Sequence, residues 1–261
     1  MSTNMEANKI VFIGSGNLAT NLAKAFFDRQ IKISQIYSRT EESARLLAEA
    51  VGADYTTSLA QVITDADIYI VALKDDVVAQ LMPQIIAGKE GALMVHTSGS
   101  LPLSIWPDSV KRKGVFYPLQ TFSKQRKVEF DSIPVFIECN NPDDNSLLKE
   151  LAACITNQVC ELSSEKRRQL HLAAVFACNF TNHMYALAEK ILKQYNIPFD
   201  YILPLIEETE KKVHYLSPHQ AQTGPAVRYD EKVINKHLEL LSGEPEMQEI
   251  YQLLSKSIHR L

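Results

Sequence analysis

The stretch Lys9–Ala19, KIVFIGSGNLA, decides the fold of this chain. Its four consecutive apolar letters, IVFI, predict a buried strand, and the letters that follow fit the pattern G-x-G-x-x-A. Gly14 permits a tight turn, Gly16 lets the backbone approach a pyrophosphate, and the small Ala19 allows the following helix to pack closely on the strand. The free N–H groups at the start of that helix hold the anion. The stretch therefore predicts a dinucleotide-binding Rossmann module, with a chance glycine turn in another α/β protein as the alternative.

The end of the second apolar run, residues 33–37, indicates which dinucleotide binds. It is followed by Ser38, Arg39 and Thr40 rather than by an acidic residue. A carboxylate there would bind the free ribose 2′-hydroxyl of NAD, whereas hydroxyls and a guanidinium suit a 2′-phosphate. We therefore expect NADP as the cofactor. The residues expected to bind it are Gly14, Ser15, Gly16, Asn17, Leu18, Ser38, Arg39, Thr40, Ala72, Leu73, Lys74, Thr97 and Ser98.

Composition and charge narrow the class of protein. Of the 261 residues, 46% are hydrophobic and 22% are charged, which is ordinary for a soluble globular protein. A net charge of −4 argues against nucleic acid or an anionic membrane as the main partner. The N-terminal letters MSTNME lack the features of a signal peptide, and no apolar run approaches the ~20 residues that span a bilayer. The four cysteines and seven histidines show no metal-binding spacing. We expect a cytoplasmic protein without a metal site.

The pattern of apolar runs predicts two domains. Strands are expected at residues 10–13, 33–37, 67–73, 92–96, 114–117, 134–138 and 158–162, and the helices between them imply right-handed crossovers and a parallel sheet. After residue 163 only helical patterns remain, beginning with one long apolar helix at residues 169–195. The predicted fold class is α/β, with an N-terminal Rossmann domain that binds NADP (residues 1–163) and a second, all-helical domain (residues 164–261).

Four residues are the candidates for catalysis. His96 begins the polar turn HTSGS at a strand end, where ligands bind in α/β sheets. Alternatively, its side chain could simply form hydrogen bonds with neighbouring residues. On the long helix, His171, Asn179 and Asn182 fall in one sector at 100° per residue. This polar stripe either faces the cleft opposite the nicotinamide, or is buried with hydrogen bonds to a neighbour, or is simply exposed. Arg228 lies in a loop between two helices. It either binds an anion or simply belongs to the turn that ends one helix and starts the next. We therefore expect His171, Asn179, Arg228 and His96 in the catalytic site, with His171 as the proton donor because imidazole exchanges protons near neutral pH.

With these motifs in hand, the chain resembles a family of NADP oxidoreductases that joins a Rossmann-like module to a helical C-terminal domain of unknown function. Members are often described as similar to deazaflavin-dependent NADP reductases. The motifs that carry the resemblance are GSGN at 14–17, SRT at 38–40, HTSG at 96–99, PLQTF at 118–122, the helix at 171–179, and TGP at 223–225 with Arg228 and Asp230. The resemblance implies a fold related to pyrroline-5-carboxylate reductases and 6-phosphogluconate-type dehydrogenases, and it supplies no substrate.

Two positions depart from the family pattern. Tyr117 stands where a histidine often precedes the proline, which weakens any case for a catalytic histidine there, and Tyr229 stands where glycine often sits. The long helix also has no Lys-x-x-x-Asn pair, so the mechanism of the 6-phosphogluconate-type enzymes is not carried over.

Two classes of function remain open from the sequence. The first is an NADPH-dependent oxidoreductase that transfers a hydride to or from a small, unidentified carbonyl, imine or flavin-like acceptor bound between the two domains. The second is a non-catalytic NADP-binding sensor or scaffold, because no clear acid/base pair stands out. The apolar helix at residues 170–191 has more apolar surface than about a hundred helical residues can cover, so we expect a homodimer through the helical domain.

Overall fold

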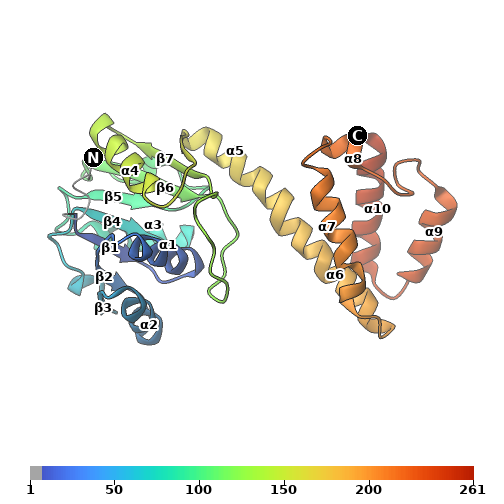
Figure 1. The fold of residues 1–261 in the computed structure, drawn as a ribbon, viewed down its shortest axis with the longest axis horizontal. Coiled ribbons are helices and arrows are strands. Elements are labelled where there is room, and N and C mark those ends of the chain that lie inside the picture. The colour runs from blue at the N-terminus through green and yellow to red at the C-terminus, as the bar shows by residue number, and fades with distance from the viewer. Residues whose placement is uncertain (1–7) are drawn as a thin grey trace. The chain divides into compact units, whose positions relative to one another are not determined.

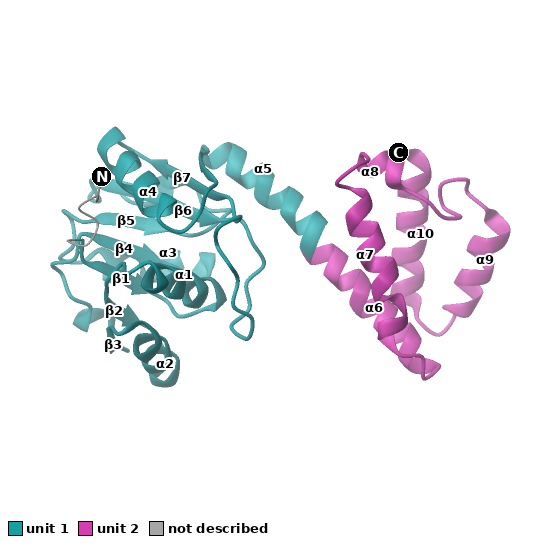
Figure 2. Ribbon diagram, viewed as in Figure 1, with its two compact units in different colours: residues 1–178 teal, residues 179–261 magenta. Residues whose placement is uncertain are grey.

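The computed structural model describes residues 8–261, so the expectation about a signal peptide, which concerns residues 1–7, lies outside the described part. Two compact units make up the chain, Met1–Cys178 and Asn179–Leu261 (Figure 2). We call them the Rossmann unit and the helical unit. The predicted fold class, α/β with a second, all-helical part, is confirmed. The boundary expected between residues 163 and 164 stays a prediction.

The Rossmann unit is built on an eight-stranded sheet of order β3-β2-β1-β4-β5-β6-β7-β8 (Figure 1). The first six strands run parallel. The order reverses between β1 and β4, and ligands of open α/β sheets bind at the carboxyl ends of the strands at such a switch point. The strands are β1 (Ile10–Ile13), β2 (Ile33–Tyr37), β3 (Asp54–Thr56), β4 (Ile68–Val71), β5 (Leu93–His96), β6 (Arg112–Pro118), β7 (Val135–Cys139) and β8 (Val159–Glu161).

The expectation of an entirely parallel sheet is wrong at one place. β7 pairs antiparallel with β6, and β8 then runs parallel to β7. The reason is that no helix connects β6 to β7, so the chain turns back directly instead of crossing over. β3 was also not predicted, because it has only three residues, of which Asp54 and Tyr55 are exposed, and carries no apolar run.

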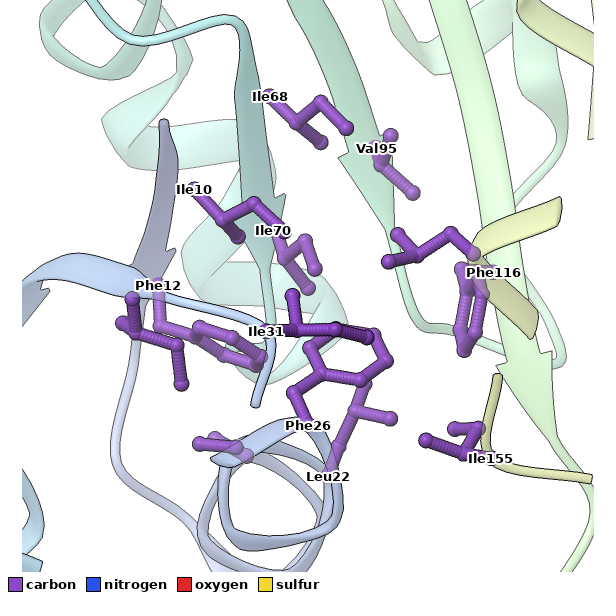
Figure 3. Close-up of a cluster of buried hydrophobic side chains, with 14 of the residues drawn as sticks. Ile10, Phe12, Leu22, Phe26, Ile31, Ile68, Ile70, Val95, Phe116 and Ile155 are labelled. Atoms are coloured by element: carbon purple, nitrogen blue, oxygen red, sulfur yellow. The ribbon is translucent and has the colours of Figure 1, made fainter. Parts of the chain in front are cut away.

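Buried side chains cover both faces of the sheet, which explains the nearly continuous apolar letters of the central strands. On one face Phe26 of α1 (Asn17–Asp28) packs edge-on against Phe12 and Phe116, with ring centroids 6.0 and 5.9 Å apart (Figure 3). On the other face Tyr69 and Trp106 belong to a second cluster. The helices of this unit before α5 are α1 (Asn17–Asp28), α2 (Glu41–Val51), η2 (Leu59–Gln61), α3 (Asp75–Ile86), η3 (Leu103–Ile105) and α4 (Pro142–Ala153).

The long helix predicted at residues 169–195 is three elements in direct succession: α5 (Ser164–Ala174), the π-helical segment η4 (Val175–Phe180) and α6 (Thr181–Gln194). A π-helix closes i→i+5 hydrogen bonds, so each turn holds more residues than an α-helical turn. The rotation of 100° per residue that aligned His171 with Asn182 therefore does not hold across η4. The boundary between the two units also falls within this segment.

The helical unit continues with η5 (Phe199–Ile202), α7 (Leu203–Lys212), α8 (Pro218–Ala221), α9 (Glu231–Leu240) and α10 (Pro245–Arg260). Its helix starts follow local sequence rules. Ser217 and Gln220 form a capping box at α8, and the Asp230 side chain accepts a hydrogen bond from the Val233 N–H at 3.3 Å to cap α9. Within residues 8–261, none of the helices has the length and apolar character needed to cross a membrane.

Candidate active site at the carboxyl edge of the sheet

The glycine turn after β1 leaves room for a pyrophosphate. Gly14 has φ = +120°, and a Cβ there would lie 2.4 Å from the carbonyl oxygen of Ala72, so only glycine fits between β1 and β4. Gly16 has an ordinary extended backbone, and a Cβ there would meet no atom within 4 Å. The open space in front of Gly16 faces the first turn of α1, whose N–H groups suit an anion. The turn therefore fits the phosphates of a dinucleotide.

A recess of about 470 Å³ extends from this turn along the ends of β1, β2 and β4. The residues predicted to bind the cofactor that line it are Gly14, Ser15, Gly16, Ser38, Arg39, Ala72, Leu73 and Lys74. The predicted residues outside its described lining are Asn17, Leu18, Thr40, Thr97 and Ser98, whose roles stay predictions. Tyr37, Ser43, Asp76, Val77, Leu81 and Lys124 also line the recess.

The β2 end of the recess carries the groups expected to select NADP. The buried Ser38 accepts a hydrogen bond of 2.7 Å from the Ser15 hydroxyl, which ties the β2 end to the glycine turn. Arg39 is exposed, so its guanidinium is available to a phosphate. Thr40 is the N-cap residue of α2, but its hydroxyl caps no helix N–H. The acidic residue typical of NAD-binding proteins is absent from this strand end.

His96, at the end of β5, is completely buried next to Trp106, with ring centroids 6.1 Å apart. Its Nδ1 accepts a hydrogen bond from the Ser98 N–H at 3.2 Å, and its buried Nε2 has no hydrogen-bond partner in the described part of the chain. Burial lowers the pKa of His96 to about 4, and the nearby Arg167 guanidinium adds to this effect. The imidazole is therefore neutral at pH 7, and whether it contributes to catalysis stays a prediction.

Tyr117, at the end of β6, forms a hydrogen bond of 3.0 Å with Nδ1 of His171 on α5. The two rings meet edge to face with centroids 6.0 Å apart, and Tyr117 is 7% exposed. Burial raises the pKa of Tyr117, which keeps its hydroxyl protonated. Gly99 allows this contact, because a Cβ there would lie 2.7 Å from the His171 ring and 2.8 Å from Tyr117 Cζ. We call Tyr117 and His171 the Tyr–His pair.

One turn before His171, the side chain of Arg167 is completely buried and anchors α5 to the sheet. Its Nη1 lies 2.5 Å from a carboxylate oxygen of Glu138 on β7, and its Nη2 donates to the Leu101 carbonyl oxygen at 2.5 Å. Ser164, at the start of α5, donates to the same Glu138 oxygen at 2.7 Å. These contacts tie α5 both to β7 and to the turn that follows β5.

The other two catalytic candidates lie in the helical unit. Asn179 is part of η4 and Arg228 belongs to the connection between α8 and α9, and both residues are exposed. Their predicted catalytic roles stay predictions. Of the four candidates, His171 is the one that contacts a polar side chain of a neighbouring strand end, the Tyr117 hydroxyl, whereas His96 accepts only from the backbone N–H of Ser98.

Sequence reasoning missed Tyr117, Gly99 and Arg167 as site residues. Tyr117 was noticed at a strand end and as a departure from a family pattern but was given no role, and Arg167 belongs to a basic cluster of the kind that is usually solvated. A usable signal was the spacing of four between Arg167 and His171, which places both side chains on one helix face.

The fold and the site define the class of protein: a dinucleotide-binding protein of Rossmann type. The domain family described as "NADP oxidoreductase coenzyme F420-dependent" matches residues 9–98, and a domain of unknown function, DUF2520, matches residues 133–258. Protein BF3122 from Bacteroides fragilis, whose name assigns it to NADP oxidoreductases, has 57% identity and a TM-score of 0.96, with 99% of this chain and 100% of that chain covered. The chain belongs to this family of NADP oxidoreductases with a DUF2520 domain, and the prediction of NADP as the family's cofactor is confirmed.

More distant structures share the fold. An imine reductase from Myxococcus stipitatus in complex with NADP⁺ has 15% identity and a TM-score of 0.67, covering 97% of this chain and 93% of that chain. A pyrroline-5-carboxylate reductase from Coxiella burnetii has 15% identity and a TM-score of 0.58, covering 97% and 96%. The predicted structural kinship to pyrroline-5-carboxylate reductases is confirmed. No curated protein matches this chain.

Proposed function

We propose that this protein is an NADPH-dependent reductase that reduces a C=O or C=N bond of a small acceptor. The observation that carries this proposal is the 3.0 Å hydrogen bond between Tyr117 and His171 at the carboxyl edge of the sheet that also holds the NADP recess. The ends of β4 and β6 are two strand spacings, about 10 Å, apart. The pair to which we assign proton donation is thus about 10 Å from the β4 end of the recess, with the end of β5 between them.

The chemistry needs one hydride and one proton. Bound NADPH supplies the hydride to the acceptor carbon. The Tyr117 hydroxyl donates its proton to the acceptor oxygen or nitrogen, which becomes an alcohol or an amine, and His171 returns a proton to the Tyr117 oxygen through Nδ1. Burial raises the pKa of Tyr117 and so makes the hydroxyl a weaker acid, which is why the proposal needs His171 to stabilise and reprotonate the Tyr117 oxygen as the proton leaves.

The acceptor class is supported by two kinds of relative. The fold neighbours include an imine reductase and a pyrroline-5-carboxylate reductase, which favours a C=N or C=O acceptor. The description of the matched N-terminal domain family includes coenzyme F420, which favours a deazaflavin as the second candidate.

The test follows NADPH absorbance in the presence of cyclic imines, ketones with and without amines, and an oxidised deazaflavin. One of these classes should be reduced, and His171→Ala and Tyr117→Phe should each lower turnover by about 100-fold or more, the usual contribution of a general acid. Neither variant should weaken NADPH binding, measured by fluorescence titration. Tight NADPH binding without turnover on any class would contradict the proposal and favour a sensor or scaffold.

We also propose that the protein forms a homodimer through the helical unit. Only two of the described apolar side chains in this unit, Ile234 and Met247, are buried. Large apolar residues are exposed on several of its elements, among them Tyr201, Leu205, Leu240 and Leu253. A second copy that covers part of this surface would stabilise the unit. Light scattering at micromolar concentration should give twice the monomer mass of 29.4 kDa, and a monomer would contradict the proposal.

A further inference from the structure

The loop between β6 and β7, residues 119–134, is fixed against the first helix at Ser123. Asn21 of α1 donates through Nδ2 to the Ser123 carbonyl oxygen at 3.0 Å and to the Asn17 carbonyl oxygen at 2.9 Å. An antiparallel bridge between Ser123 and Arg126 closes a tight turn directly after this contact. The backbone of Lys124 is therefore tied to the first turns of α1, close to where the pyrophosphate is expected.

The side chain of Lys124 borders two adjoining recesses. One is the NADP recess, where it shares the wall with Arg39 and Ser43. The other, of about 370 Å³, lies between α1 and α2, and Lys124 and Ser43 line it as well. Lys124 is exposed and makes no ion pair or hydrogen bond within the part of the chain that the structure describes. Its ammonium group is therefore available to a ligand at the β2 end of the NADP recess.

A matched lysine three residues further on has a partner already. Lys127, in the same loop, lies 2.8 Å from the Asp28 carboxylate. It lines a different recess, which it shares with Asp28 and Arg29. The two lysines thus have the same charge and the same loop, but only Lys124 borders the NADP recess.

The charges around Lys124 favour an anion. Arg39 and Lys74 are further cations in the described lining of the NADP recess, where Asp76 carries the opposite charge, and Lys24 of α1 adds a positive charge in the adjoining recess. The Glu42 carboxylate in that recess opposes them. The balance leaves a net positive charge in the region where a 2′-phosphate is expected, since NADP carries this doubly charged group and NAD does not.

We propose that Lys124 binds the 2′-phosphate of NADP(H) together with Arg39, so that the β6–β7 loop helps to select NADPH over NADH. This inference rests on NADP as the cofactor and is independent of the proposed reaction. Arg39 lies two residues after the end of β2, whereas Lys124 comes from a loop 85 positions later in the chain that is anchored on α1. The two cations would then hold the phosphate from two separate elements.

The test is cofactor binding to the full-length protein, measured by calorimetry with NADPH, NADH, 2′,5′-ADP and ADP. Lys124→Ala should weaken NADPH and 2′,5′-ADP by about threefold to tenfold, the size of an exposed ion pair to a doubly charged group. Its affinity for NADH and ADP should not change. The loss should shrink as salt is raised towards 1 M, because the pair is screened, and Lys124→Arg should keep most of the affinity.

Lys127→Ala is the control and should bind all four ligands as the unaltered protein does. Equal losses for 2′,5′-ADP and ADP would overturn the proposal, because Lys124 would then bind the pyrophosphate. Unchanged affinity for NADPH in Lys124→Ala would overturn it as well. Since no acceptor is present, failure of the proposed reductase activity cannot be confused with either result.

Discussion

Replacing Gly16 with valine tests the central feature of the site, the open glycine turn. In the structure Gly16 has φ −70° and ψ −175°, an extended conformation that valine adopts readily, and its added Cβ would meet no protein atom within 4 Å. The side chain would instead fill the space expected for the pyrophosphate. We therefore predict that Gly16→Val folds normally and loses NADPH binding.

The expected magnitudes differ widely for stability and for binding. Gly16 is the N-cap residue of α1 and makes no side-chain cap, so valine there should cost only about 1 kcal/mol, or about 2–4 °C in Tm. Displacing the pyrophosphate removes hydrogen bonds from the helix N–H groups to a charged group, each worth about 1.5–3 kcal/mol. Losing two such bonds corresponds to about 100-fold or more in Kd.

The assay is NADPH fluorescence titration together with thermal unfolding in the absence of cofactor. Gly14→Ala is the informative contrast, since its φ of +120° and a Cβ only 2.4 Å from the Ala72 oxygen require the backbone to move. It should therefore lower Tm far more than Gly16→Val. Near-normal NADPH affinity in a folded Gly16→Val protein would refute the assignment of the turn. A loss of Tm equal to that of Gly14→Ala would refute the steric argument.

Three further changes probe other parts of the site. Arg39→Ala should weaken NADPH by about 10- to 150-fold and leave NADH nearly unchanged, because a hydrogen bond to a charged group is worth about 1.5–3 kcal/mol; equal losses in titration would contradict this. Gly99→Ala should lower turnover without weakening NADPH binding, since its Cβ would lie 2.7 Å from the His171 ring and displace it; unaltered turnover would show that the Tyr–His pair tolerates displacement. Burial holds the pKa of His96 at about 4 in the folded protein, below the 6.5 of an unfolded histidine, so the unfolded chain takes up the proton first as pH falls. The free energy of unfolding of the unaltered protein, measured by urea titration, should thus decrease between about pH 6.5 and 4 by up to about 3 kcal/mol. His96→Gln should lack this contribution. Parallel pH profiles for the two proteins would contradict the lowered pKa of His96.

The cofactor half of the site could be predicted because its chemistry is local in sequence. The glycine turn, the helix start and the SRT letters after β2 each lie within a few residues, and their pattern is set by backbone geometry and ligand charge. The strands predicted from apolar runs were recognisable for the same reason, and helix caps are local as well. Ser217 and Asp230, for example, cap the helices that directly follow them.

His171 was expected as the proton donor, but its partner Tyr117 and the buried Arg167 could not be predicted, because their contacts join residues that are distant in the sequence. Tyr117 and His171 are 54 positions apart, and Arg167 and Glu138 are 29 apart. Neither pair has a local signal, since a buried arginine and a solvated one look alike in sequence. The π-helical segment also escaped prediction, because apolar periodicity over residues 169–195 suits an uninterrupted α-helix.

The reversal of the chain at β7 explains why α5 presents His171 to Tyr117. Because β7 is antiparallel to β6, Glu138 lies opposite Val115, two residues before Tyr117 and therefore on the same face of the sheet. Arg167 of α5 pairs with Glu138, and four helical residues later, a rise of about 6 Å, comes His171. Two strand residues from Val115 to Tyr117 also advance about 6.6 Å. The rise along the helix and the advance along the strand are therefore nearly equal. The buried ion pair between Arg167 and Glu138 thus positions the His171 imidazole level with the Tyr117 hydroxyl.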